Sequence, residues 1–243
     1  ALWQDPADRA AAERVQGFLA TRMIGPDGGF YSSFGMEAGE PGVDRNQYAR
    51  ENGQAIAGLA AFAMATGHAA ALGQAIDGAK WVLANRALAG GGFRHGPSDP
   101  AGPYLGDTLA MGQAFLLLYQ ATADRTWLDH ARGAGDFIAR TFIDPATGGF
   151  VTAAGQAARH LPDAVKQKDE NVAATRFFNL LAQHINSAPY RAIAETGMGY
   201  LASPAILDAY GFLPDVLLAE MELAHEAVRV TIVGAKDDPA ALR

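Results

Sequence analysis

The sequence predicts an all-α protein, an α/α toroid in which helix pairs form a ring, with a short β element at the C-terminus. Three observations support this fold class. Apolar residues recur at helical spacing in about nine stretches. The tripeptide Gly-Gly-Phe occurs three times, about 60 residues apart, which indicates a structural repeat. Helices with almost no charge alternate with amphipathic ones.

The helical periodicity is clearest in six stretches of the chain, from Pro6 to Met23, Asn46 to Thr66, His68 to Leu88, Leu105 to Ala123, Arg125 to Phe142 and Asp169 to His184. Asn52, Asp107 and Asn171 each lie near the start of a helix, and we take them as equivalent positions of the repeat. Each of these helices should end at a short turn, at Gly67, Ala123 and Asn186.

The first helix of each pair is rich in small and apolar residues, as in Ala55 to Ala60 and Leu109 to Gly112, which predicts burial on nearly all sides. The second helix carries charges on one side, namely Asp77, Lys80 and Arg86 in one pair and Asp129, Arg132, Asp136 and Arg140 in the next. An inner ring of apolar helices covered by amphipathic outer helices is an α/α toroid. A solenoid of helix pairs would share the pattern but would not require uncharged first helices.

The Gly-Gly-Phe copies at 28–30, 91–93 and 148–150 each follow a helix and precede a polar stretch. This placement is typical of glycines at positive φ that turn the chain, with the Phe packing back between two helices. We therefore expect three equivalent loops on one face of the ring.

A length of 243 residues is enough for one large domain or two small ones. We expect a toroid domain over 1–227 and the start of a C-terminal α/β segment, truncated, over 228–243. Val228 to Gly234 alternates like a strand, and Asp238 to Arg243 has the pattern of a capped first helical turn. The absence of Cys excludes disulfides, thiol catalysis and Cys-based metal sites within this chain.

The net charge of −7 has the wrong sign for a general nucleic-acid or anionic-membrane binder. The longest apolar runs, Ala55 to Thr66 and Leu109 to Tyr119, are well short of the ~20 residues that a membrane span requires. We expect a soluble, cytoplasmic protein with neither nucleic-acid nor membrane partners.

Several short motifs occur in a definite order, namely Gly28 to Ser33, Asn52-Gly53, Tyr104 to Asp107, Leu118 to Thr122, Trp127-Leu128, Asn171 to Ala174 and Thr231 to Gly234. In this order they resemble the thioredoxin-domain proteins that include the spermatogenesis-associated thioredoxin-like protein of animals. The resemblance implies a thioredoxin-like domain, absent from this chain, followed by an α/α barrel similar to those of N-acylglucosamine 2-epimerase and six-hairpin glycosidases. It also implies an aromatic residue where Glu51 stands, and Ser-Gly where Asp169-Glu170 stands.

Three carboxylates, Glu51, Asp107 and Glu170, are the candidate catalytic residues. They lie at the starts of inner helices, so we expect them on one face of the ring at the mouth of a funnel. Two carboxyl groups across a sugar are the minimum for glycoside hydrolysis. Each carboxylate can instead simply complement a helix N-terminus. Mutual repulsion should raise the pKa of at least one of them. We expect neither a metal nor a cofactor.

The candidate substrate-binding residues are polar or aromatic groups near the same end of the helices, namely Tyr31, Arg45, Tyr48, Asn52, Arg94, His95, Tyr104 and Asn171. Aromatic and guanidinium groups suit a sugar through stacking and bidentate hydrogen bonds, although packing explains them equally well. Sugar 2-epimerisation usually needs a His pair. The sequence supplies such a pair poorly, because only His95 and His160 lie in loops that could reach the mouth, and a place at the surface or in a turn explains each histidine better.

Two functional hypotheses follow. The first is a domain that binds or processes a carbohydrate-like small molecule, glycoside hydrolase-like or sugar epimerase-like if it is an enzyme. The second is a non-catalytic scaffold or interaction domain of a thioredoxin-family protein.

Overall fold

The computed structural model describes residues 5–37, 40–155, 165–225 and residue 228. Within them the chain is mostly helical, which confirms the predicted fold class. The elements in chain order are α1 (Pro6–Phe18), the short π-helix η1 (Leu19–Met23), β1 (Ser33–Glu37), β2 (Glu40–Asp44), α2 (Ala49–Thr66), α3 (Ala69–Asn85), α4 (Leu105–Thr122), α5 (Arg125–Thr141), α7 (Lys168–Ile185), α8 (Ala188–Leu201), α9 (Pro204–Ala209) and α10 (Pro214–Ala224). The strand predicted from Val228 lies outside the described residues beyond Val228 itself.

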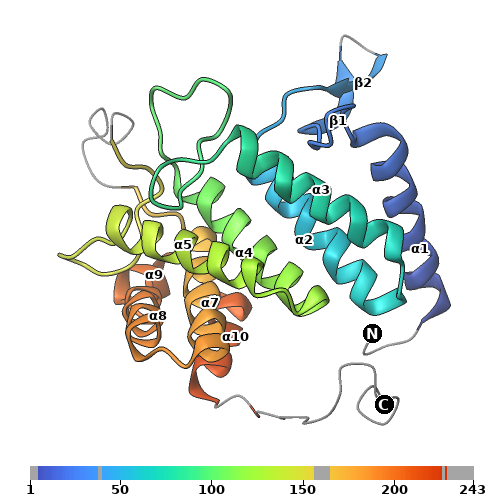
Figure 1. The fold of residues 1–243 in the computed structure, drawn as a ribbon. Helices are drawn as coiled ribbons and strands as arrows, with labels where there is room; N and C mark the ends of the chain where they lie inside the picture. The colour runs from blue at the N-terminus through green and yellow to red at the C-terminus, as the bar shows by residue number, and fades with distance from the viewer. Residues whose placement is uncertain (1–4, 38–39, 156–164, 226–227, 229–243) are drawn as a thin grey trace.

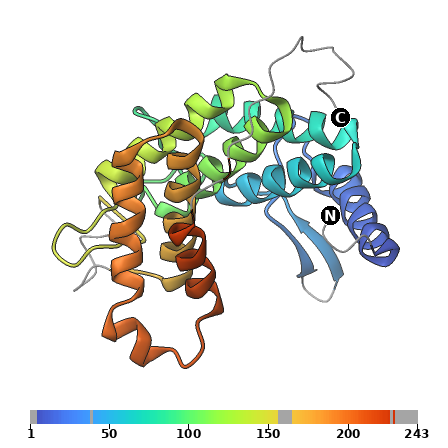
Figure 2. The ribbon, with the colours of Figure 1, turned by 90° about the horizontal axis from the view of Figure 1, so that it is seen from below.

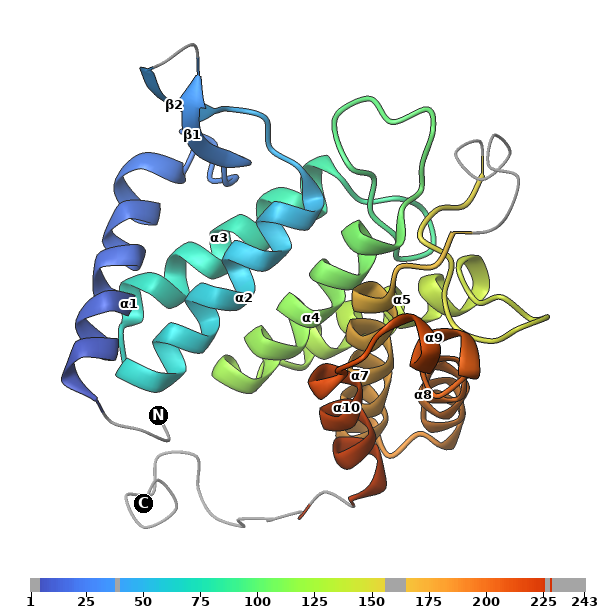
Figure 3. The ribbon, with the colours of Figure 1, turned by 180° about the vertical axis from the view of Figure 1, so that it is seen from behind.

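Three helix pairs, α2/α3, α4/α5 and α7/α8, follow one another around a curve (Figures 1 and 2). Helix α2 packs on α4, α4 on α7 and α7 on α10, so these four are the inner helices (Figure 3). Helices α3, α5 and α8 are the outer partners. The described chain is therefore an arc of an α/α toroid. None of the described helices is long and apolar enough to cross a membrane.

Burial follows the predicted alternation only in part. Helix α2 was expected to be buried on nearly all sides, but it exposes Gln54, Gly58 and Met64. Helix α4 is buried on almost every side, from Leu105 to Leu118, whereas α5 buries a single face that includes Trp127 and Ile138. The structure corrects the prediction for Arg86. It was expected on the polar face of its helix, but it is only 7% exposed, and its guanidinium donates to the carbonyl of Gln47.

The predicted ends of the inner helices are confirmed. Helices α2, α4 and α7 end at Gly67, Ala123 and Asn186, each in the left-handed backbone conformation. Outer helices α5 and α8 then begin at once, with the side chains of Asp124 and Ser187 accepting hydrogen bonds from backbone N–H groups of their first turns.

The three Gly-Gly-Phe loops have the same construction. The first glycine has φ of 95°, 96° and 70° in turn, at Gly28, Gly91 and Gly148. The second glycine lies against an aromatic ring of the outer helix, with Trp81 facing Gly29, Phe137 facing Gly92 and Tyr200 facing Gly149. The Phe is buried in every copy and forms a β-bridge to the chain before the loop, with the pairs Ile24 and Phe30, Ala87 and Phe93, and Ile143 and Phe150.

The hairpin of β1 and β2 was not predicted. The two strands pair antiparallel with Ser33 opposite Asp44, between the first Gly-Gly-Phe loop and α2. The hairpin base is closed by the N–H of Ser32, which donates to the carbonyls of Asp44 and Asn46.

Candidate functional site

The N-terminal ends of α2, α4 and α7 are tied to the three Gly-Gly-Phe loops by polar side chains. Asn52 accepts from the N–H of Phe30 at 2.7 Å and donates to its carbonyl at 2.9 Å. Asn171 makes the same two bonds with Phe150, at 2.7 and 2.9 Å. Both amides are fully buried beneath the loops.

The equivalent tie on α4 corrects the predicted phase of the repeat. The N–H of Phe93 donates to the hydroxyl of Thr108 at 3.1 Å, so Thr108, and not Asp107, corresponds to Asn52 and Asn171. Each tie is the fourth residue of its helix, which makes Glu51, Asp107 and Glu170 the third residue of α2, α4 and α7. The three carboxylates thus occupy equivalent positions at the same end of the inner helices.

Asp107 is buried and paired with His95. Its Oδ1 accepts from the backbone N–H of Arg50 at 3.0 Å and lies 3.0 Å from His95 Nδ1. The Asp107 side chain is 2% exposed and that of His95 39% exposed. An ionised carboxylate only accepts, so in this contact Nδ1 of His95 is the donor, and in the neutral tautomer with that proton the lone pair lies on Nε2.

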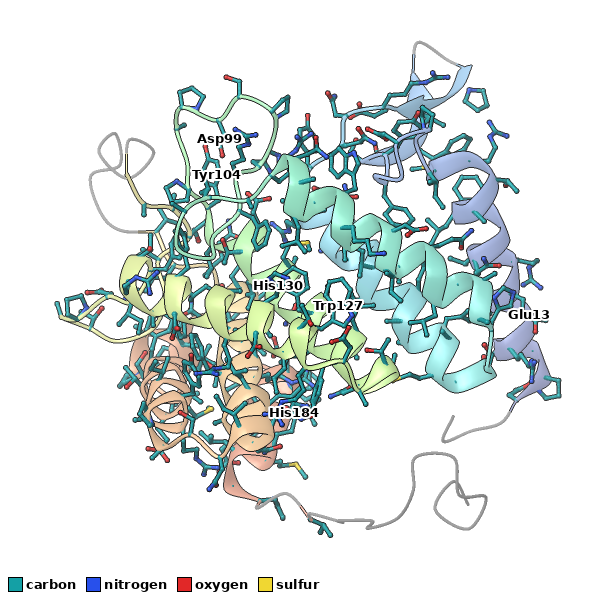
Figure 4. The ribbon with its side chains drawn as sticks, in the orientation of Figure 1. Glu13, Asp99, Tyr104, Trp127, His130 and His184 are labelled. Carbon is teal, nitrogen blue, oxygen red and sulfur yellow. The ribbon has the colours of Figure 1, made fainter. Side chains whose placement is uncertain are left out.

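The ring of His95 is held by aromatic groups and by its own loop. Tyr48 stacks on it with centroids 4.2 Å apart, and Tyr104 meets it edge-on at 6.3 Å. The backbone N–H of His95 donates to Asp99, which also accepts from Gly102. Asp99 and Tyr104 lie in the loop above the start of α4 (Figure 4).

Burial raises the pKa of Asp107 above its ordinary value, opposed mainly by the hydrogen bond and charge of His95. The charge of Glu51 adds a smaller upward contribution. A raised pKa was expected from repulsion among the carboxylates, but the larger cause is desolvation.

Glu170, in the first turn of α7, places its carboxyl group against the start of α4. Its Oε1 is 3.7 Å from Arg50 Nη1. A Cβ built on Gly106 would lie 3.1 Å from that same oxygen, so the carboxyl lies against the residue that precedes Asp107. Burial raises the pKa of Glu170, while the Thr152 hydroxyl and the charge of Arg50 act in the opposite direction. Arg50 therefore joins the two sites, with its backbone on Asp107 and its guanidinium beside Glu170.

The remaining predicted binding residues lie elsewhere in this region. Arg45 packs over the ring of Tyr31 at 5.9 Å, beside the hairpin. The guanidinium of Arg94 donates to the carbonyl of Asn85 at 2.8 Å. The side-chain amides of Asn52 and Asn171 are hydrogen-bonded to the backbone of the Gly-Gly-Phe loops. Binding roles for these residues stay predictions, as does that of His160, which lies outside the described residues.

Sequence reasoning named His95 but not its pairing with Asp107, and it did not name Arg50. The missing signal is tertiary, since the loop carrying His95 closes over the start of α2, where the N–H of Ala49 donates to the His95 carbonyl at 3.0 Å. Among the described residues, no group of three His, Asp or Glu side chains is placed to hold a metal ion.

A hollow of about 720 Å³ follows the concave side of the inner helices. Apolar residues such as Leu116, Val172 and Leu180 form much of its lining, and Asp169 and Asp215 line it at the starts of α7 and α10. Glu51, Asp107 and Glu170 are not among its lining residues as the structure describes it.

No family model and no curated protein matches the chain. Among solved structures, a sugar epimerase from a ruminal bacterium aligns with a TM-score of 0.69 at 13% identity, over 91% of this chain and 69% of that one. Cellobiose 2-epimerase from Bacillus thermoamylovorans aligns at 0.70 and 10% identity, over 90% and 69%. A GH76 α-mannanase from Bacteroides thetaiotaomicron aligns at 0.60 and 15% identity, over 74% and 52%.

These likenesses show the fold, shared by epimerases and six-hairpin glycosidases. The chain spans between 52% and 69% of the length of these three structures. The resemblance to thioredoxin-domain proteins finds no support in any of the comparisons.

Proposed function

We propose that this chain binds a sugar-like small molecule at the N-terminal ends of α2, α4 and α7 and moves a proton on it, with His95 as the base. The observation that carries the proposal is the pairing of half-exposed His95 with buried Asp107, at 3.0 Å. The pair lies at the end of the inner helices where the polar groups of all three repeats gather. The fold neighbours, which are carbohydrate-processing enzymes, support a sugar as the ligand.

In the proposed reaction, Nε2 of neutral His95 removes the proton from the carbon next to a sugar carbonyl. The electron pair of the C–H bond moves to the carbonyl oxygen. Water then gives a proton to the opposite face of the carbon as the carbonyl re-forms, and the imidazolium returns its proton to the hydroxide left behind, which gives the epimer. Asp107 stabilises the imidazolium and keeps Nδ1 protonated. The guanidinium of Arg50, 46% exposed, is the nearby cation for the developing oxyanion.

Glycoside hydrolysis is the second candidate, favoured by one observation. Burial raises the pKa of Glu170, as a general acid requires, and Glu51 stands at the equivalent position of another repeat.

The fold neighbours do not favour the scaffold alternative. The association with a thioredoxin-like domain, the cytoplasmic location and the domain boundary after residue 227 stay predictions.

One set of assays distinguishes epimerisation from glycoside hydrolysis. Reducing hexoses incubated with the protein in D2O should exchange the proton at C2, followed by NMR, while aryl glycosides should stay intact if epimerisation is the reaction. His95→Asn should reduce the exchange rate at least about 100-fold. The matched control His225→Asn changes an exposed histidine at the end of α10 and should keep the wild-type rate. Release of aryl alcohol without C2 exchange would replace epimerisation by hydrolysis. The absence of both activities would contradict the proposal.

A further inference from the structure

Large apolar side chains that remain exposed gather at the two ends of the arc. One group, the α1 patch, lies on α1 and β1 and consists of Val15, Phe18 and Phe34. The other, the α10 patch, lies on α9, α10 and the loop between them and consists of Leu207, Tyr210, Phe212, Leu217, Leu218 and Met221. No large apolar residue of α3, α4 or α5, in the middle of the described arc, is exposed to this extent. Exposed apolar groups that gather in this way mark interaction surfaces, whereas singly scattered ones are ordinary.

Helix α10 has one covered face and one open face. On the covered face, Val216 and Ala219 are buried in a cluster with residues of α7 and α8. On the open face, Leu217 and Met221 lie one turn apart and are 58% and 55% exposed. The other inner helices α2, α4 and α7 are each followed at once by an outer helix that packs on them. The open face of α10 lacks such a cover among the described residues.

The α10 patch is acidic. The segment 204–224, which holds α9 and α10, has neither Lys nor Arg but contains Asp208, Asp215, Glu220 and Glu222. Asp215 and Glu222 are paired with cations of α7. Glu220 is exposed, precedes Met221 directly, and has no ion-pair partner in the described part of the chain. A surface that fits this patch is therefore apolar and carries a cation.

The α1 patch has these two properties. None of the 13 residues of α1 is buried, and Val15 is 59% exposed. The ring of Phe34 meets that of Phe18 edge-on, and the guanidinium of Arg22 lies over the Phe34 ring at 5.6 Å. Arg22 makes no ion pair within the described ranges. The patch is thus an apolar surface with an available positive charge at its edge.

The two patches cannot cover each other within one molecule, because they lie at opposite ends of the arc (Figures 2 and 3). A second copy of the chain supplies the complementary surface for each of them. In a two-fold arrangement the contact between an α1 patch and an α10 patch is made twice, which leaves neither patch open in either copy.

We propose that a second copy of this chain covers the α10 patch with its α1 patch, in a two-fold dimer. In each contact the apolar side chains of the two patches pack together at the centre, and Glu220 of one copy faces Arg22 of the other. This division into an apolar core and a charged rim is typical of protein interfaces. The inference is independent of the proposed function.

Sedimentation velocity of the whole chain tests the inference. At about 100 μM the wild type should sediment as a species of twice the 25.5 kDa of one chain and dissociate on dilution. Leu217→Glu places a charge in the α10 patch and Val15→Glu in the α1 patch, and each should weaken the dimer at least about tenfold. Both side chains are exposed in the single chain, so the circular dichroism of the variants should match that of the wild type.

The matched control is Thr126→Glu, which adds the same charge at an exposed position of α5. It should leave the dimer unchanged. A Leu217→Glu or Val15→Glu variant that dimerises like the wild type would overturn the inference, because both patches take part in every contact.

Mixing the two patch variants tests which patch meets which. In a mixed dimer one contact joins the unaltered α10 patch of Val15→Glu to the unaltered α1 patch of Leu217→Glu. The equimolar mixture should therefore contain more dimer than either variant alone at the same total concentration. A mixture that is no more associated than its two components would contradict the pairing of unlike patches.

A wild type that is monomeric at about 100 μM would also overturn the inference. The rate at which peroxide oxidises Met221, compared with exposed Met64, would then identify the alternative. Slow oxidation of Met221 would mean that other residues of the same chain cover the α10 patch. Oxidation as fast as that of Met64 would leave the patch to a different partner.

Discussion

At the scale of single residues, Asp107 has a task that its position in the sequence conceals. A carboxylate in the first turn of a helix ordinarily complements that helix's own N–H groups. Here the carboxylate instead accepts from the N–H of Arg50 on α2 and from His95 in a loop, at 3.0 Å in both cases. Asp107 therefore connects two inner helices and sets the tautomer of the imidazole.

Replacing Asp107 with Asn tests whether its charge supports the base. Both contacts use Oδ1, so an Asn oxygen in that position can still accept from Arg50 and from Nδ1 of His95, but the neutral amide no longer stabilises the imidazolium that forms during the reaction. We expect the C2 exchange rate to fall at least about 100-fold with a small change in melting temperature. An unchanged rate would show that the charge of Asp107 does not assist His95. A large loss of stability would show that its role is structural.

Glu170 predicts a pH dependence of stability. Burial raises the folded-state pKa of Glu170 above its ordinary value of 4.5, so the unfolded chain ionises first as the pH rises. The contribution of Glu170 is therefore fully present below about pH 4.5 and is lost as the pH rises through the folded-state value. Glu170→Gln removes this loss of stability at higher pH.

We accordingly expect the melting temperature of Glu170→Gln, relative to wild type, to be higher at about pH 7 than at about pH 4. Calorimetric scans at the two pH values measure the difference. Asp169→Asn, on the exposed side of the same turn, should show no comparable dependence. A Glu170→Gln variant that is destabilised more at the higher pH would contradict burial as the dominant cause.

At the scale of elements, the repeated unit is a loop clamped between two helices. The inner helix holds the Phe backbone through Asn52, Thr108 or Asn171, and the outer helix presses an aromatic ring against the second glycine. The tripeptide and its spacing were enough to predict a turn. The clamp was not predictable from the tripeptide, because its partners lie in helices on either side.

The clamp predicts opposite effects for two glycines. A Cβ on Gly92 would lie 2.5 Å from ring carbons of Phe137, so Gly92→Ala should destabilise the fold by about 1–3 kcal/mol. Gly73, within α3, has no neighbouring atom within 4 Å of such a Cβ. Gly73→Ala should thus be neutral or stabilising by up to about 1 kcal/mol. Urea unfolding of both variants measures the difference, and equal effects would refute the packing role of the second glycine.

At the scale of the whole molecule, the alternation of apolar and amphipathic helices was sufficient to predict the toroid, although α4 is buried on nearly every side and α2 exposes one side. The β1–β2 hairpin was missed for a physical reason. Its strands place Gly35 opposite Gly42 and include Pro41, so the segment shows no regular alternation. Its pairing depends on the closed base at Ser32, Asp44 and Asn46.

The candidate site was predictable to the extent that it follows the repeat. The equivalence of the helix starts predicted that Glu51, Asp107 and Glu170 lie at the same end of the inner helices. It wrongly matched Asp107, instead of Thr108, with Asn52. The pairing of His95 with Asp107 and the bridging position of Arg50 depend on how a loop closes over a neighbouring helix. No local pattern encodes such contacts.

The most direct test of a sugar site at this end of the arc is hydrogen–deuterium exchange mass spectrometry with and without a reducing hexose at saturating concentration. We expect protection in peptides that span 46–52, 93–108 and 166–172, where the starts of α2, α4 and α7 and the His95 loop lie. Protection confined to the middle of α7 and to α10, along the hollow of the concave face, would place the ligand elsewhere and contradict the site described here.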